Sequence, residues 1–183
     1  DAERRRRGGS GGEIQYERAH TVLQRLPHTL PHHFRVRLFH DEIARIKAAL
    51  AAARGERRNF PRVTIRRDYI LTDGFRELGR LSPEALRETV RITFVNAQGL
   101  EEAGIDENGV FKEFLEDMIA EAFSPDFGLF AVTEDNHLYP SPTSHIHAEH
   151  LNLFEFIGRM LGKSVFEGHL VDVPFAHFFL NAL

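Results

Sequence analysis

The chain has 183 residues, with 23 lysine and arginine residues against 27 aspartate and glutamate residues, and it contains no cysteine. The absence of cysteine excludes disulfides, cysteine-ligated zinc, iron–sulfur clusters and a thiol nucleophile within this chain. No apolar run reaches the roughly 18 residues that a membrane-spanning helix needs, so we expect no membrane association. The chain does not begin with methionine and it ends in an apolar run, so we expect it to be a piece of a longer protein.

Charge is unevenly distributed along the chain. Residues 1–67 hold 16 basic and 7 acidic residues, whereas residues 68–183 hold 7 basic and 20 acidic residues. The basic run Arg4 to Arg7 lies beside a glycine-rich stretch, a composition typical of a solvated linker. No aromatic residue lies among these arginines to stack on bases, so we expect no nucleic-acid partner. We interpret residues 1–26 as this linker plus a short helix from Ile14 to Leu26.

Residues 27–100 are predicted to alternate between helices and short strands. Apolar residues spaced three and four apart indicate helices, alternating β-branched residues indicate strands, and a serine followed by proline and glutamate indicates a capped helix start. These signals predict, in chain order, a helix over 36–54, a strand over 63–67, a helix over 70–81, a short helix from Ser82 and a strand over 91–95.

Two long helices dominate the predicted second half of the chain. A wide apolar stripe predicts a helix over 110–123, and a nearly all-apolar surface predicts a second helix over 147–167, buried at the centre of the domain. Between them we expect a hairpin that pairs 129–132 with 138–139, and Pro174 is predicted to open a last helix. The predicted fold class is therefore α+β and mainly helical, with short strands and two long core helices.

The segment Gly158 to Ser164 resembles a phosphate-binding loop. Its glycines are separated by three residues instead of four, and it lies inside a predicted helix whose amide groups are already hydrogen-bonded. We therefore expect no nucleotide or other cofactor there. We interpret Gly158 and Gly162 instead as positions where a neighbouring helix approaches closely.

His145, His147 and His150, with Glu149 among them, are the clustered residues of metal-binding type. Catalytic zinc helices place two histidines four residues apart, whereas His147 and His150 are three apart. We interpret the group as the solvated first turn of a helix and expect no metal. Nothing in the sequence resembles a nucleophile elbow, so we assign no catalytic residue.

The run from Asn96 to Phe114 resembles a signature of HECT-type ubiquitin ligases. In that family a short strand leads through an acidic, glycine-bearing loop into a helix. Three further regions agree with the family in order and spacing: Val63 to Arg67, Leu138 to Pro142, and Phe156 to Lys163 followed by Val171 to Phe175. The resemblance covers about residues 31–183 and is greatest to the subgroup whose members carry an IQ region upstream.

This resemblance implies that residues 27–183 form the first part of the N-terminal lobe of a HECT domain. Such a lobe recruits a ubiquitin-conjugating enzyme, and a smaller C-terminal lobe carries the cysteine that accepts ubiquitin as a thioester and transfers it to substrate lysines. The implied partners are a ubiquitin-conjugating enzyme, ubiquitin and protein substrates. The implied catalytic cysteine would lie beyond Leu183, so this piece is expected to be an inactive scaffold. The implied location is cytoplasmic, with the nucleus as an alternative.

Some family members bind a second, non-covalent ubiquitin on the hairpin of this lobe. By resemblance, the residues implied are Leu129, Asn136, His137 and Tyr139, with Asn136-His137 standing where one subgroup has Asn-Tyr. The alternative is that the chain is a truncated, non-catalytic paralogue that serves as a ubiquitin- or protein-binding module.

Overall fold

The computed structural model describes residues 21–22, 25–53, 60–102 and 107–182. The chain divides into two compact units, Asp1–Arg57 and Arg58–Leu183. The domain predicted to start at residue 27 therefore includes residues of both units. The predicted basic linker lies outside the described residues, as does most of the short helix predicted between Ile14 and Leu26. The described residues 21–22 and 25 within that range are helical, and the Leu26 amide donates to the Val22 carbonyl.

The first unit contains a short 3-10 turn, η1 (Pro27–Thr29), and a long helix, α2 (His32–Ala53). The predicted helix is confirmed, and it begins four residues earlier than expected because the carbonyl of Pro31 accepts the first helical hydrogen bonds. None of the helix residues is buried.

The second unit begins with two parallel strands, β1 (Arg62–Arg66) and β2 (Arg91–Val95). Parallel strands need a long crossover connection. It is supplied here by η2 (Arg67–Tyr69), α3 (Ile70–Leu78) and α4 (Pro83–Arg87). The start of α4 follows the predicted capping signal, since the Ser82 side chain accepts a hydrogen bond from the Ala85 amide.

A buried carboxylate fixes α3 against β1. Asp73 is 1% exposed, and its oxygens accept hydrogen bonds from the Arg66 backbone amide at 3.0 Å and from the Arg66 guanidinium at 2.8 and 2.9 Å. The hydrogen bond from the Arg66 side chain is the main reason why the pKa of Asp73 is lowered, against the opposing effect of burial. The carboxylate of Glu121 accepts the Leu71 amide at 3.1 Å and so joins α3 to the next long helix.

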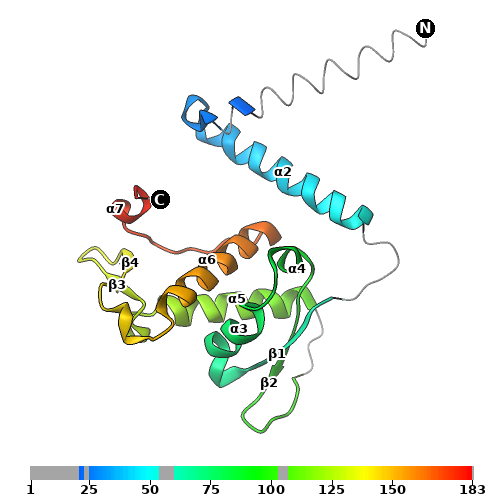
Figure 1. Ribbon diagram of the computed structural model, residues 1–183, viewed down its shortest axis with the longest axis vertical. Helices are drawn as coiled ribbons and strands as arrows, with labels where there is room; N and C mark the ends of the chain where they lie inside the picture. The colour runs from blue at the N-terminus through cyan, green and yellow to red at the C-terminus, as the bar shows by residue number, and fades with distance from the viewer. Residues whose placement is uncertain (1–20, 23–24, 54–59, 103–106, 183) are drawn as a thin grey trace. The chain divides into compact units, whose positions relative to one another are not determined.

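Helices α5 (Glu107–Phe123) and α6 (His150–Glu167) form the centre of the second unit (Figure 1). Helix α5 packs against β2 and α3 and also contacts α6. The largest fully buried apolar side chains of the two helices are Phe114, Leu115, Met118, Phe156, Ile157 and Met160. The predicted class, mainly helical α+β with two long core helices, is confirmed.

Helix α6 departs from the sequence prediction in how it is buried. Leu151 is 70% exposed and Val165 is 45% exposed, so one face of the helix is open instead of buried all round. A Cβ atom added to Gly158 or Gly162 would meet no described atom within 4 Å outside the helix itself. The prediction that these glycines admit a neighbouring helix is therefore wrong, because both lie on the exposed face.

The remaining elements of the second unit are short. In chain order they are η3 (Pro125–Phe127), β3 (Phe130–Val132), β4 (Leu138–Pro140), η4 (Ser144–Ile146) and α7 (His177–Leu180). Helix α6 ends at Gly168, whose φ of 84° lies in the left-handed region that favours glycine. Among the described helices, none has both the length and the apolar character needed to cross a membrane.

Candidate functional site

The β3–β4 hairpin is the expected antiparallel pair, with Ala131 opposite Tyr139 and Val132 opposite Leu138. Thr133 closes its turn. The Thr133 amide donates to the His137 carbonyl at 2.9 Å, and the Thr133 hydroxyl accepts the His137 amide at 3.0 Å. Asn136 has a φ of 59°, a left-handed conformation that asparagine tolerates better than most residues. The backbone of the turn is thus fixed from both sides.

The segment before α7 is extended beside β4 and forms a single β-bridge with it. The Leu138 amide donates to the Pro174 carbonyl at 2.7 Å, and the Ala176 amide donates to the Leu138 carbonyl at 2.8 Å. This pairing is parallel, with Leu138 opposite Phe175. It keeps Pro174 extended, so the helix predicted to open at Pro174 begins only at His177.

Aromatic rings join the hairpin and this segment to the core. Phe130 lies 4.5 Å from Phe123 of α5 and 5.3 Å from Phe154 of α6, measured between ring centroids. Phe175 lies 5.5 Å from Phe123 and 5.4 Å from Phe179. Such aromatic pairs stabilise by about 0.5–1.5 kcal/mol each beyond the area that they bury. The hairpin is therefore anchored on both long helices.

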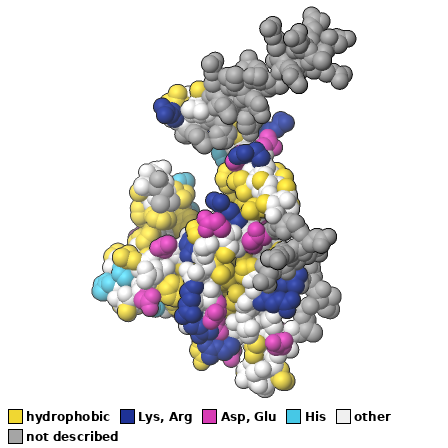
Figure 2. Space-filling view, turned by 45° about the vertical axis from the view of Figure 1, so that its right-hand side comes forward, with side chains coloured by type: hydrophobic (Ala, Val, Ile, Leu, Met, Phe, Trp, Pro, Cys, Tyr) yellow, Lys and Arg dark blue, Asp and Glu magenta, His cyan; other side chains and the backbone are white. Residues whose placement is uncertain are grey.

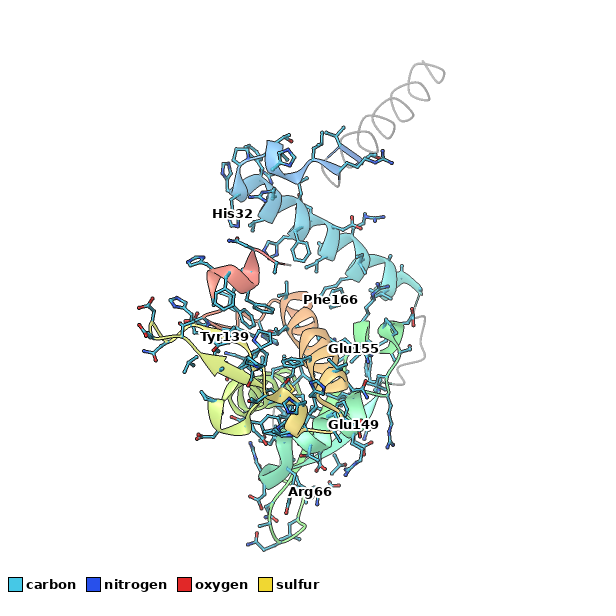
Figure 3. All side chains as sticks on the ribbon, turned by 60° about the vertical axis from the view of Figure 1, so that its left-hand side comes forward. His32, Arg66, Tyr139, Glu149, Glu155 and Phe166 are labelled. Carbon is cyan, nitrogen blue, oxygen red and sulfur yellow. The ribbon has the colours of Figure 1, made fainter. Side chains whose placement is uncertain are left out.

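The four hairpin residues named from the sequence occupy different environments. Leu129 is fully buried and its carbonyl accepts the Ser141 amide, so it anchors the hairpin and offers no side-chain surface to a partner. Asn136 is exposed, and His137 and Tyr139 are half-buried at the surface. Tyr139 lies beside α7 (Figure 3), with its ring 5.4 Å from that of Phe178.

We call the residues around this turn and at the start of α7 the hairpin surface: Asn136, His137, Tyr139 and Phe178. Phe178 is 59% exposed. Val132 is also exposed, but it lies opposite Leu138, so its side chain is on the other face of the hairpin from Tyr139. The hairpin surface therefore combines an apolar ring with an amide, an imidazole and a phenol. This composition suits the recognition of another protein, because an apolar anchor lies beside hydrogen-bonding groups.

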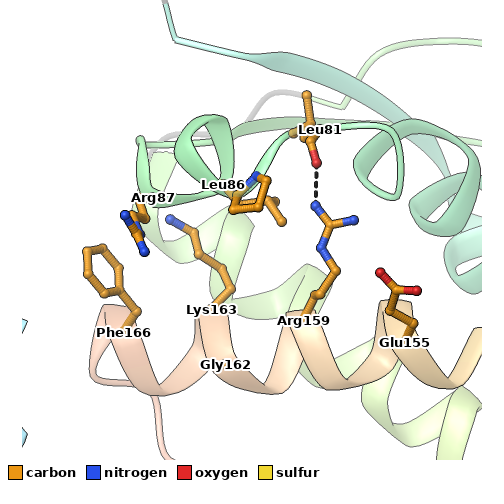
Figure 4. Close-up of a pocket in the computed structure, with 9 residues that line it drawn as sticks. Leu81, Leu86, Arg87, Glu155, Arg159, Gly162, Lys163 and Phe166 are labelled. Carbon is orange, nitrogen blue, oxygen red and sulfur yellow. Dashed lines mark hydrogen bonds between the residues drawn. The ribbon is translucent and has the colours of Figure 1, made fainter.

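A groove of about 530 Å³ lies between α4 and α6 in the second unit (Figure 4). Its apolar lining is Leu81, Pro83, Leu86 and Phe166, and Gly162 lies along one side. Arg159 crosses the groove and donates hydrogen bonds to the carbonyls of Gly79, at 2.9 Å, and Leu81. Arg159 thereby joins α6 to the turn before α4. A more polar hollow of about 460 Å³ lies beside this groove and shares Glu155 and Arg159 with it.

The histidine cluster is more structured than the sequence predicted. Helix α6 begins at His150 instead of His147, because His147 has an extended backbone. The His147 ring stacks on Phe127 at 4.6 Å and its Nε2 hydrogen-bonds to the Phe127 carbonyl at 2.6 Å. His150 Nδ1 lies 3.1 Å from the Ser144 hydroxyl. His147 and His150 are therefore structural contacts of the second unit and not a solvated turn.

A network centred on Arg67 joins β2 and the loop after it to α5, the elements that carry the sequence signature. The guanidinium of Arg67 lies 2.8 Å from Glu102, 2.7 Å from Glu113 and 3.4 Å from Asp117. It also lies 3.6 Å above the ring of Phe94. Hydrogen bonding to Glu102 is the main reason why the pKa of Arg67 is raised. Figure 2 shows basic and acidic side chains interspersed on the displayed face.

Comparison with known proteins places the chain in a family. Residues 116–183 match the family described as HECT-domain (ubiquitin-transferase). Ubiquitin-protein ligase E3B of Homo sapiens is 48% identical over 170 residues, which cover 91% of this chain and 16% of that protein. The chain belongs to the HECT family.

Two further relatives of this HECT chain come from a plant and a yeast. E3 ubiquitin-protein ligase UPL6 of Arabidopsis thaliana is 44% identical over 167 residues, covering 91% of this chain and 16% of that protein. E3 ubiquitin-protein ligase HUL5 of Saccharomyces cerevisiae is 35% identical over 177 residues, covering 88% of this chain and 19% of that protein. The HECT chain thus spans less than a fifth of the length of these curated relatives.

Sequence reasoning missed the contribution of the C-terminal segment to the hairpin surface. His177 and Phe178 lie about 40 positions away in the sequence from the residues that they face, so no local pattern pairs them. The alternating apolar residues Val171, Val173 and Phe175 are the signal that could have indicated an extended strand there.

Proposed function

We propose that this chain is scaffold within a HECT-type ubiquitin ligase. In that enzyme, the thiolate of a cysteine attacks the thioester carbonyl that links ubiquitin to a conjugating enzyme, and the conjugating enzyme's thiol leaves. The ε-amine of a substrate lysine then attacks the new thioester, forms an amide bond and releases the cysteine. The observation that carries this proposal is the 48% identity over 91% of the chain to a protein named as a ubiquitin-protein ligase.

The role of this chain in that reaction is structural, since it contains no cysteine to accept ubiquitin. Its two core helices, the parallel strand pair and the Arg67 network present a rigid body on which other parts of the ligase act. Incubating the 183-residue chain with a ubiquitin-charged conjugating enzyme should give no reductant-sensitive ubiquitin adduct, whereas the full-length ligase should form one. Failure of the full-length protein to form this adduct with a panel of conjugating enzymes would contradict the proposal.

We further propose that the hairpin surface contacts ubiquitin without a covalent bond. The support is its composition: Phe178 is an exposed apolar side chain, and Asn136, His137 and Tyr139 offer hydrogen-bonding groups near it. Leu129 is no longer part of the proposed contact because it is fully buried. In this role the chain is a binding module, either within the ligase or on its own.

An NMR titration of isotope-labelled chain with unlabelled ubiquitin tests this contact. We expect shifts at the amides of residues 132–139 and 177–178, and loss of those shifts in Tyr139→Ala. Leu151→Ala is the matched control, since it removes an exposed apolar side chain from α6, which is not part of the hairpin surface. Equal shifts in the two variants would remove the hairpin surface as the ubiquitin contact.

A further inference from the structure

We propose that Lys112 of α5 is the acceptor lysine through which the ligase attaches ubiquitin to this part of itself. The inference rests on the proposed function, because the ubiquitin has to come from the thioester of the full-length ligase. It goes beyond that function by assigning a modification site to one side chain of the scaffold.

The chain carries very few amines that could accept ubiquitin. Of its 23 basic residues, only Lys47, Lys112 and Lys163 are lysines, and all the others are arginines. The guanidinium of arginine stays protonated in proteins, so it supplies positive charge without a nucleophilic nitrogen. A lysine amine can lose its proton and attack a carbonyl carbon. The choice of acceptor side chain therefore lies among three residues.

Burial excludes Lys163 of α6. This residue is 5% exposed, and its Nζ donates to the Glu88 carbonyl at 2.8 Å and pairs with the Glu167 carboxylate. The Nζ atom also lies 5.6 Å from the ring centroids of Phe111 and Phe166. A thioester could reach this amine only after α6 had opened locally and these contacts were lost.

Lys47 of α2 is restricted to a smaller degree. It is half-buried, and it is already engaged in a non-covalent interaction. The amine has to give up that interaction before it can attack a thioester. Lys47 is therefore a poorer acceptor than a fully accessible lysine.

Lys112 combines exposure with a weak tether. Its side chain is 54% exposed, and its Nζ lies 3.6 Å from a carboxylate oxygen of Glu116, which is itself 61% exposed. Exposed ion pairs one turn apart on a helix contribute little to stability and are screened by salt, so this amine leaves its partner easily. Phe111 and Phe114 of the same helix are buried in the core, which fixes the backbone that carries the lysine.

The reaction needs no group beyond those of the proposed function. The Lys112 ammonium loses one proton to solvent, and the neutral amine attacks the carbonyl carbon of the thioester between ubiquitin and the catalytic cysteine. An amide bond forms at Nζ and the carbon–sulfur bond breaks. The proton released from the nitrogen ends on the sulfur, which leaves as the free thiol.

Mass spectrometry of the full-length ligase tests the site. The ligase is incubated with ubiquitin, activating enzyme, conjugating enzyme and ATP, and is then digested with trypsin, which leaves a Gly-Gly remnant on each lysine that carried ubiquitin. Among the lysines of residues 1–183, we expect at least about tenfold more remnant at Lys112 than at Lys163, because Lys163 reacts only from a locally opened state. Lys112→Arg keeps the charge and should abolish ubiquitin on this segment without its transfer to Lys47. Lys47→Arg is the matched control and should leave the remnant at Lys112 unchanged.

The inference is overturned if Lys47 or Lys163 carries most of the remnant, if none of the three lysines carries it, or if Lys112→Arg moves it to Lys47 at the same level. Equal thermal midpoints for the two variants and the unaltered ligase establish that all three are folded. The reductant-sensitive ubiquitin adduct, measured in the same samples, separates the two proposals. An adduct without modification of Lys112 removes this inference alone, whereas the absence of the adduct removes the proposed function as well.

Discussion

Replacing Gly158 and Gly162 by alanine should stabilise the protein. Both glycines lie inside α6 on its exposed face, and an added Cβ would meet no described atom within 4 Å outside the helix. Glycine inside a helix costs roughly 0.5–1 kcal/mol relative to alanine, because the unfolded chain loses more conformational freedom. The double variant should therefore gain about 1–2 kcal/mol in free energy of unfolding.

Gly74 of α3 provides the matched control, because it is also a helical glycine but lies against the core. A Cβ added there would lie 2.9 Å from Cζ of Phe114, a side chain that is fully buried. Overpacking of this kind costs about 1–3 kcal/mol, which exceeds the gain in helix propensity. Gly74→Ala should thus destabilise while the α6 variants stabilise.

Urea unfolding followed by far-ultraviolet circular dichroism gives both free energies, provided that the slope against urea concentration stays constant across the variants. A loss of stability in Gly158→Ala or Gly162→Ala would refute the reasoning, since it would mean that another part of the protein packs closely on that face. A neutral Gly74→Ala would show that the Phe114 ring moves aside easily.

Three further sets of substitutions test the core, the buried carboxylate and the helix cap. Phe156→Ala should cost about 3–5 kcal/mol in free energy of unfolding, and Phe154→Ala should cost less because that ring is only half-buried, as urea titrations of both variants would show. The pKa of Asp73 is lowered by Arg66, so its stabilising effect is present above the ordinary carboxyl pKa of about 4 and is lost as pH falls toward the lower folded value. Unfolding of Asp73→Asn measured at a series of pH values should therefore show a lower stability at neutral pH and a smaller loss on acidification; identical pH profiles would contradict this. Ser82→Ala should cost about 1 kcal/mol through loss of the cap, whereas Ser82→Gly should cost only a few tenths, and equal thermal midpoints for all three proteins would exclude the capping role.

Local signals predicted most elements of the second unit. The cap at Ser82, the alternation in β1 and the apolar stripe of α5 act within a few residues of each other, so their effect can be seen in the sequence. The glycine that ends α6 is of the same kind, because Gly168 alone supplies the left-handed backbone. These elements are set by short-range preferences that the surrounding fold agrees with.

The misses have a common physical cause, which is contact between distant residues. The open face of α6 depends on which surfaces other elements cover, and its apolar composition could not reveal that. The acidic partners of Arg67 lie 35 to 50 positions away in the sequence. Pro174 stays extended because its carbonyl accepts a hydrogen bond from the Leu138 amide. The candidate ubiquitin-binding site was missed in part for the same reason. The family resemblance predicted the hairpin, but only the folded structure shows that Leu129 is buried and that Phe178 lies beside Tyr139.

The aromatic anchoring of the hairpin has a consequence for synthesis of the chain on the ribosome. Phe123 and Phe130 are made early, but two of the rings that pack with them belong to Phe154 and Phe175, and Phe179 closes the cluster. At about 5–20 residues per second, the 56 positions from Phe123 to Phe179 take roughly 3–11 s to translate. During those seconds the rings on α5 and β3 lack their later partners, so this stretch of the nascent chain exposes apolar surface that favours aggregation.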